Sequence, residues 1–261
     1  MDVIATFFPR IIAWALVASR LAGFVVVSPF PGPNAPTAQR AALVATLSFF
    51  VTSLAPADHV PKEVSFLLVS SAVTELLAGL CIGFTFRLVM SSSEVLGAMV
   101  SQACGLSTPS VLNPATEAHE TPLAKAFSLL GILLALGMGA HRTALLYLID
   151  SFQALPVGSD MFIAASMPRV VGIGFDAIAV GVRLAMPALG IYLLSQLSLA
   201  MVARAAPQLQ IFNIGLTVTL GAGFVTLISS LGSVSRGFTD YLGTLGPRMD
   251  SVLSAVAGGG G

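Results

Sequence analysis

Apolar residues gather in six long stretches of the chain, which short segments rich in proline and polar residues separate. The stretches are residues 11–27, 41–55, 64–90, 126–149, 170–202 and 211–234. A helix that crosses a bilayer needs about 20 predominantly apolar residues. Four of the stretches reach this length, the first is close to it and the second is shorter. A half-apolar segment, residues 94–106, either extends the third stretch or forms its own helix.

We predict that these stretches are α-helices rather than strands. They are too long for strands, and they lack the alternation of apolar and polar residues that is typical of a membrane barrel. A helix also satisfies its own backbone hydrogen bonds, which lipid cannot do. The pattern therefore predicts an all-α integral membrane protein with about six long apolar helices.

Prolines mark the connections, because proline removes a backbone donor and clashes with the preceding turn. The connections are residues 28–36, 55–62, 105–122, 150–169 and 205–210. None of them is long enough for a second domain. We therefore expect one membrane domain over residues 1–261, with a C-terminal tail from residue 236 whose glycine-rich end is disordered.

The composition supports a membrane environment. Hydrophobic residues make up 56% of the chain and charged residues only 9%, against about a quarter charged in soluble domains. So much apolar surface must face lipid or partner subunits. The 12 basic and 12 acidic residues balance, and no cluster of Lys and Arg suggests a nucleic-acid partner. The start of the chain lacks the features of a cleaved signal peptide, so the first stretch is expected to be retained.

The basic residues of the connections show no bias between the two presumed sides. The positive-inside rule therefore gives no orientation. One interpretation is chance variation. The other is that the helices do not cross a bilayer in a simple serpentine order.

Charged residues within the apolar stretches are the most informative. Each costs roughly 2.5–3.5 kcal/mol at the centre of a bilayer and so must find a partner or water. Asp176 and Arg183 are seven residues apart, which places them on one helix face together with Pro187. They either line a conduit or subunit contact, or form an internal ion pair.

Glu75, Gly79 and Gly83 follow one another at four-residue spacing. Gly79 and Gly83 form a small-xxx-small pattern, which allows two helices to approach closely. Glu75 needs a donor, for which Arg87 and a neighbouring subunit are the candidates. Arg20, in the first stretch, raises the same question.

Residues suited to catalysis or metal binding do not form a recognisable set. Cys81 and Cys104 are isolated, and we interpret both as small packing residues. His59, His119 and His141 lack metal-ligand neighbours at helical spacing. No phosphate-binding loop of the Walker kind occurs. We therefore expect no enzymatic activity, no metal and no cofactor.

Residues 105–122 form the longest polar connection and contain Pro109, Pro114 and Pro122. A long segment of this kind in a compact domain is functional or disordered. In a channel it would serve as a plug. Without further information, a solvent-exposed connector is the favoured interpretation.

Several stretches together resemble the FliR family, the flagellar export-gate subunits that are related to an injectisome subunit. The N-terminal resemblance is carried by Arg20, Gly23, Ser28, Pro29, Pro36 and Arg40. The middle is carried by Glu75, Gly79, Gly83, Gly97, Gln102, Gly105, Leu106 and Ser107, and the next loop by His141, Ser151, Phe152, Pro156 and Gly158. The most specific part is the joint at residues 203–215, which contains Arg204, Pro207 and Gln208. The resemblance runs from about residue 10 to 235, although Gln210 and Thr219 depart from the family pattern.

The resemblance implies helical hairpins in a ring-like gate of the bacterial inner membrane, at the flagellar basal body. The implied partners are FliP-like and FliQ-like gate subunits, FlhB-like and FlhA-like proteins of the export apparatus, membrane lipid and the unfolded proteins that are exported. It also reverses the interpretation of residues 105–122, which become a gate plug. The implied plug residues are Gly105, Leu106, Ser107, Pro109, Val111, Leu112, Asn113 and Pro114.

Two other functions compete with an export-gate subunit. A secondary transporter of a small solute would use the charges inside the membrane near broken helices, but the chain shows no two-halved repeat. An intramembrane enzyme would need catalytic residues, which the sequence does not supply. We therefore expect Arg20, Glu75, Asp176 and Arg183 to make polar contacts between helices or subunits.

Overall fold

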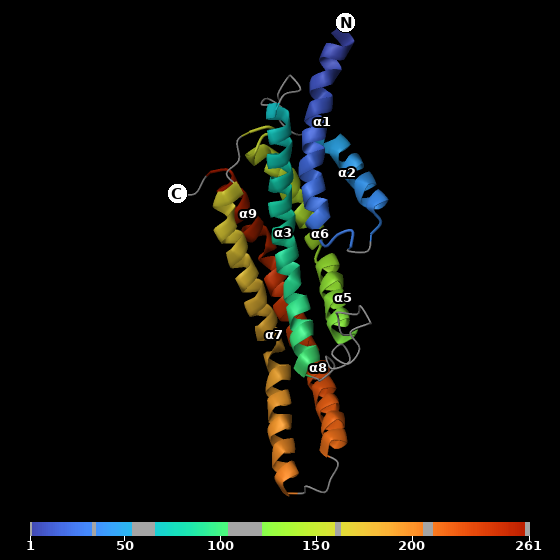
Figure 1. Ribbon diagram of the computed structural model, residues 1–261, viewed down its shortest axis with the longest axis vertical. Coiled ribbons are helices and arrows are strands. Elements are labelled where there is room, and N and C mark those ends of the chain that lie inside the picture. The colour runs from blue at the N-terminus through green and yellow to red at the C-terminus, as the bar shows by residue number, and fades with distance from the viewer. Residues whose placement is uncertain are drawn as a thin grey trace. The chain divides into compact units, whose positions relative to one another are not determined.

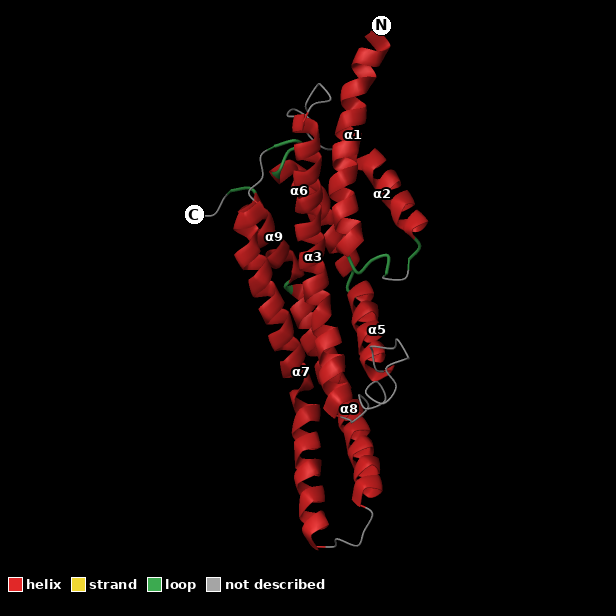
Figure 2. Ribbon diagram, viewed as in Figure 1, coloured by secondary structure: helices red, strands yellow, loops and turns green. Residues whose placement is uncertain are grey.

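The computed structural model describes residues 2–32, 35–53, 66–103, 122–159, 163–205 and 211–258 (Figure 1). All regular elements within these ranges are helices (Figure 2). The predicted plug residues, from Gly105 to Pro114, lie outside the described residues, as do Pro207 and Gln208 of the joint. Cys104, His59, His119 and residues 259–261 lie outside them too.

The helices confirm the prediction of an all-α membrane protein. They are α1 (Asp2–Val27), α2 (Thr37–Thr52), α3 (Phe66–Ala103), α5 (Pro122–Gly137), α6 (Ala140–Ala154), α7 (Ile163–Ala205), α8 (Ile211–Gly243) and α9 (Leu245–Val256). Three segments in the described part are long and apolar enough to cross a membrane: Arg10–Val27, Leu68–Gln102 and Ile163–Arg204. A fourth results if α5 and α6 count as one bent span. The expected number of about six long helices in the membrane is not confirmed.

The helix boundaries differ from the sequence pattern in two places. Residues 126–149 form two helices, bent by 64° at a short break before α6. The break contains Gly139, whose φ of +72° lies in the left-handed region that favours glycine. Residues 94–103 continue α3 without interruption.

The C-terminal tail contains a helix, α9, that the apolar stretches do not reveal. Its buried residues are Leu245, Met249, Val252, Ala255 and Val256. Their spacing is that of an amphipathic helix, in which only one face is apolar. A search for uniformly apolar stretches misses such a helix, because polar residues occupy the other face.

The described residues pack into two compact units. Unit 1 comprises Met1–Val89, Gly139–Phe175 and Gly243–Gly261, and unit 2 comprises Met90–Met138 and Asp176–Leu242. The long helices α3 and α7 each contribute one segment to each unit. The single domain inferred from the sequence stays a prediction.

In unit 1, helices α1 and α3 pack at very short distance. A Cβ atom on Gly79 would collide with the backbone carbonyl of Arg20, and one on Gly23 with that of Leu76. A Cβ on Gly83 would lie 2.7 Å from the carbonyl oxygen of Phe24. Glycines on both helices therefore allow direct backbone contact, as small residues do in membrane helix pairs. Helix α2 packs on α1, and α9 packs on α6.

Unit 2 has its own apolar core. Its members are Leu96, Val100, Phe127, Ala185, Ala188 and Val234. Glycines bring the helices together here as well. A Cβ on Gly97 of α3 would lie 2.9 Å from the Cα of Ala124 in α5, and one on Gly181 of α7 would lie 2.8 Å from the carbonyl oxygen of Ser92 in α3.

Candidate functional site

The most deeply buried charges of unit 1 belong to Arg20 of α1 and Glu75 of α3. Both side chains have a relative exposure of 0%. The Nε of Arg20 donates a hydrogen bond of 2.5 Å to Oε2 of Glu75. The donor that Glu75 requires is therefore Arg20, whereas Arg87, the candidate named from the sequence, is exposed on α3.

The remaining nitrogens of Arg20 bind the end of α6. Nη1 donates to the carbonyl oxygen of Ser151 at 3.0 Å and to its Oγ at 3.1 Å. Nη2 donates to the carbonyl oxygen of Leu155 at 3.0 Å. The carbonyl oxygen of Ser151 also accepts from the backbone N–H of Leu155 at 2.9 Å. The last carbonyls of a helix carry partial negative charge. The guanidinium therefore caps α6 while it neutralises Glu75.

An aromatic ring completes the surroundings of the guanidinium. Its central carbon lies 4.2 Å from the ring centroid of Phe152. Planar guanidinium groups interact favourably with aromatic faces, and more strongly when water is absent. Arg20 thus has polar or aromatic contacts on several sides, as a charge buried away from water requires.

Glu75 connects α3 to the loop between α6 and α7. Its Oε1 accepts a hydrogen bond of 3.0 Å from the backbone N–H of Gly158. Gly158 has a φ of +83°, which a residue with a side chain adopts only at a cost. The glycine therefore allows the loop to turn its N–H towards the carboxylate.

The glycine contacts and the ion pair belong to one arrangement. Gly79 lies one helical turn after Glu75 and contacts the backbone of Arg20 itself. Because the two backbones touch, the short Glu75 side chain reaches the guanidinium directly. We call the set Arg20, Glu75, Ser151, Leu155 and Gly158 the polar clasp of unit 1, since it joins α1, α3, α6 and the following loop.

The clasp is suited to holding helices rather than to chemistry. Removing one partner of a buried ion pair leaves an uncompensated charge, which costs about 3–5 kcal/mol. We expect such a set to favour one register of the helices, because each partner is matched to one position on its neighbour. Within the part of the chain that the structure describes, no group of three His, Cys, Asp or Glu side chains is arranged to hold a metal ion.

The other charges singled out in the sequence lie elsewhere. Asp176 and Arg183 are both exposed on α7, and the structure leaves both interpretations of them open. Arg204 is exposed in the last turn of the same helix, where a cation complements the helix dipole. Cys81 is buried, and its Sγ lies 3.9 Å from the Oγ of Ser166.

Three members of the clasp were not identified as contact residues from the sequence. Leu155 acts through its backbone carbonyl, Gly158 acts through its N–H, and Ser151 acts through both its carbonyl and its hydroxyl. A backbone group can come from any residue type, so composition and spacing give no sign of it. Ser151 and Gly158 entered the sequence argument only as part of the resemblance to the FliR family.

Comparison with known proteins agrees with that resemblance. A family model described as bacterial export proteins, family 1, matches residues 11–245. The chain is 28% identical to the flagellar biosynthetic protein FliR of Escherichia coli strain K12 over 209 residues, which cover 80% of this chain and 79% of that protein. It is 27% identical to the protein of the same name from Caulobacter vibrioides over 242 residues, which cover 92% and 96%.

A third relative is the flagellar biosynthetic protein FliR of Aquifex aeolicus, which is 28% identical over 227 residues. These residues cover 85% of this chain and 88% of that protein. The matched range of the family model contains Arg20, Glu75 and Gly158, and so includes the side chains and the loop of the clasp. The chain belongs to the bacterial export proteins, family 1.

Proposed function

We propose that this chain is a structural subunit of the flagellar type III export gate and forms part of the channel through which unfolded flagellar proteins are secreted. Its relatives are named flagellar biosynthetic protein FliR. In this role it catalyses no reaction. The solute-transporter alternative finds no support in these relatives.

The observation that carries the proposal is a contrast between two sets of side chains. The buried charges Arg20 and Glu75 are paired, whereas many large apolar side chains are exposed. In unit 2, many large apolar side chains of α7 and α8 remain exposed. They are Met186, Ile191, Leu193, Leu194, Leu197, Met201 and Val202 of α7, and Phe224, Val225, Ile228 and Leu231 of α8. Large apolar side chains exposed in this number along two helices need lipid or a protein partner to cover them. A gate subunit has both.

The partners in this proposal are FliP-like and FliQ-like gate subunits, together with FlhB-like and FlhA-like proteins of the export apparatus. The site of assembly is the inner membrane at the flagellar basal body. Family membership and the membrane-spanning segments support this placement. The clasp then serves assembly by holding α1, α3 and α6 in one register before partners bind.

A gene deletion tests the function. Loss of the chain from its host is expected to abolish secretion of flagellar proteins and swimming, and the wild-type gene is expected to restore both. The tagged chain is expected to co-purify with other small apolar subunits. Solute uptake by liposomes that contain the isolated chain would contradict the proposal, because a gate subunit does not work alone.

The plug role of residues 105–122 is a separate proposal, which rests on the resemblance to the FliR family. Deletion of residues 106–120 is expected to raise ion leakage through the assembled gate while the complex still forms. Unchanged leakage in a complex of normal composition would remove the plug role and leave the gate function intact.

A further inference from the structure

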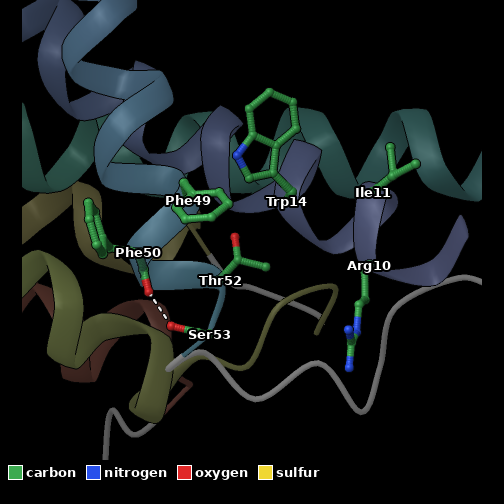
Figure 3. Close-up of a pocket in the computed structure, with 7 residues that line it drawn as sticks. All are labelled: Arg10, Ile11, Trp14, Phe49, Phe50, Thr52 and Ser53. Carbon is green, nitrogen blue, oxygen red and sulfur yellow. Dashed lines mark hydrogen bonds between the residues drawn. The ribbon is translucent and has the colours of Figure 1, made fainter. Parts of the chain in front are cut away.

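A cavity of about 710 Å³ lies in unit 1, where the first half of α1 meets the end of α2 (Figure 3). The described residues that line it are Arg10, Ile11, Trp14, Phe49, Phe50, Thr52 and Ser53. Arg10, Ile11 and Trp14 come from α1, and the others come from the last turn of α2 and the residue after it. The polar clasp uses none of these residues.

Arg10 lies within α1, directly before the apolar stretch of residues 11–27. Trp14 follows four residues later, which places it on the same helix face and one turn further along the helix. Arginine and tryptophan are typical of the boundary between hydrocarbon and water, where one end of the side chain is apolar and the other is polar.

Aromatic rings supply the apolar wall. Phe49 and Phe50 are 72% and 63% exposed, and their ring centroids lie 5.8 Å apart in an edge-on arrangement. Trp14 is 39% exposed. These surfaces suit an acyl chain, and the faces of the same rings attract a cation.

The polar groups of the cavity differ in what they offer. The guanidinium of Arg10 offers only donors. The hydroxyl of Thr52 donates to the carbonyl oxygen of Ser48 at 2.6 Å, and that of Ser53 donates to the carbonyl oxygen of Phe50 at 2.6 Å. With their protons engaged, both hydroxyl oxygens are left as acceptors. The end of α2 adds partial negative charge from its last carbonyls.

We propose that this cavity binds a phospholipid with an ethanolamine headgroup. The phosphodiester pairs with Arg10, which matches phosphate oxygens with two parallel donors. The primary ammonium donates to the oxygens of Thr52 and Ser53 and to the end of α2, and an acyl chain lies against Ile11, Trp14 and the phenyl rings. A phosphocholine headgroup carries the same charges but has no N–H to donate, and a glycerol headgroup has no cation.

The chain carries its own reporter for this site, because Trp14 is its single tryptophan. The test uses the full chain in maltoside micelles, to which phospholipids with brominated acyl chains are added. Bromine quenches indole fluorescence on contact. Phosphatidylethanolamine is expected to reach half-quenching at a mole fraction about fivefold lower than phosphatidylcholine or phosphatidylglycerol, as one added charge-assisted hydrogen bond provides.

Arg10→Gln is expected to remove this preference, and Arg10→Lys to keep part of it. The control is Arg183→Gln, which removes an exposed arginine from α7 in unit 2 and is expected to leave the quenching curve unchanged. Replacing both Phe49 and Phe50 by Ala is expected to raise the half-quenching mole fraction. The helical content by circular dichroism is expected to stay the same, because all of these side chains are exposed.

Equal quenching curves for the three lipids, or for the wild type and Arg10→Gln, would overturn the proposal, because quenching would then report only general contact with lipid. If Arg10→Gln removes a co-purifying protein and leaves the lipid preference intact, the cavity is a protein interface and the proposal is wrong. Native mass spectrometry of the purified chain gives an independent measurement. Retained phosphatidylethanolamine on the wild type and its loss from Arg10→Gln are expected.

Discussion

The two units solve the same packing problem in different ways. Both use glycine to bring helices into contact, Gly79 against α1 in unit 1 and Gly97 against α5 in unit 2. Unit 1 adds a buried ion pair whose hydrogen bonds come from other parts of the chain. In unit 2, the buried Ser93 beside such a contact donates to Met90 of its own helix, at 2.9 Å.

This difference between Arg20 and Ser93 indicates which hydrogen bonds depend on the register of neighbouring helices. A hydroxyl that is satisfied within its own helix remains satisfied if the neighbouring helix slides. Arg20 would lose its hydrogen bonds if a neighbouring helix moved, because Glu75, Ser151 and Leu155 all belong to other elements. Arg20 and Glu75 are therefore expected to tolerate fewer substitutions than Ser93.

The largest effect is expected from breaking the ion pair. Glu75→Ala leaves Arg20 buried without its counter-charge, and the free energy of unfolding in mixed micelles should fall by about 3–5 kcal/mol. The double variant Arg20→Met/Glu75→Leu should be more stable than Glu75→Ala, because it buries no charge. The single variants Arg20→Met and Glu75→Leu complete the comparison. If the double variant loses as much free energy of unfolding as the two single variants together, the two residues act independently.

The next effect is expected at the contact between α1 and α3. Gly79→Ala places a methyl group against the backbone of Arg20 and should cost about 1–3 kcal/mol, measured by the same unfolding assay. Gly97→Ala should have a similar effect in unit 2. The control is Gly172→Ala on α7, where a Cβ meets nothing within 4 Å. Equal stability of the Gly79 and Gly172 variants would contradict direct backbone contact.

A smaller effect is expected at the loop that Glu75 holds. Gly158→Ala forces a side chain into the left-handed region and should cost about 1–2 kcal/mol. Gly190→Ala is the control, since it lies in α7 with open space around it. The thermal midpoints of the two variants in detergent give the comparison, and coincident midpoints would show that the loop conformation is not needed.

The smallest effect on the isolated chain is expected from Arg183→Ala. The side chain is exposed, so the free energy of unfolding should change by less than about 0.5 kcal/mol. If α7 contacts another gate subunit at this position, the yield of the co-purified complex should fall. Normal yield together with a large loss of stability would instead identify Arg183 as part of an internal ion pair.

The sequence indicated which charged residues need an interaction partner, but it did not indicate which residues supply that partner. Arg20 and Glu75 stand in apolar stretches where a lone charge is costly. They are 55 positions apart, and no periodicity links them. Only packing selects Arg20 over Arg87 as the partner of Glu75. Packing alone also decides that backbone groups of Ser151, Leu155 and Gly158 reach the ion pair, so the sequence did not predict these partners.

The helices themselves show the same division. Uniformly apolar stretches predicted α1, α3 and α7, because their composition satisfies the requirement of a membrane span regardless of what they pack against. The position of the break at Gly139 and the one-sided helix α9 were not predicted. The first depends on a backbone conformation at one glycine, and the second on an apolar face too narrow for a search based on composition.

The sequence by itself determined that this protein is helical, apolar and short of charge, because those properties follow from the residues and from the bilayer in which they are stable. The tertiary structure decided which charges meet, which glycines are in contact and where a cavity opens. Those features depend on distances between segments that are far apart in the chain, and the order of residues does not encode such distances in any local pattern.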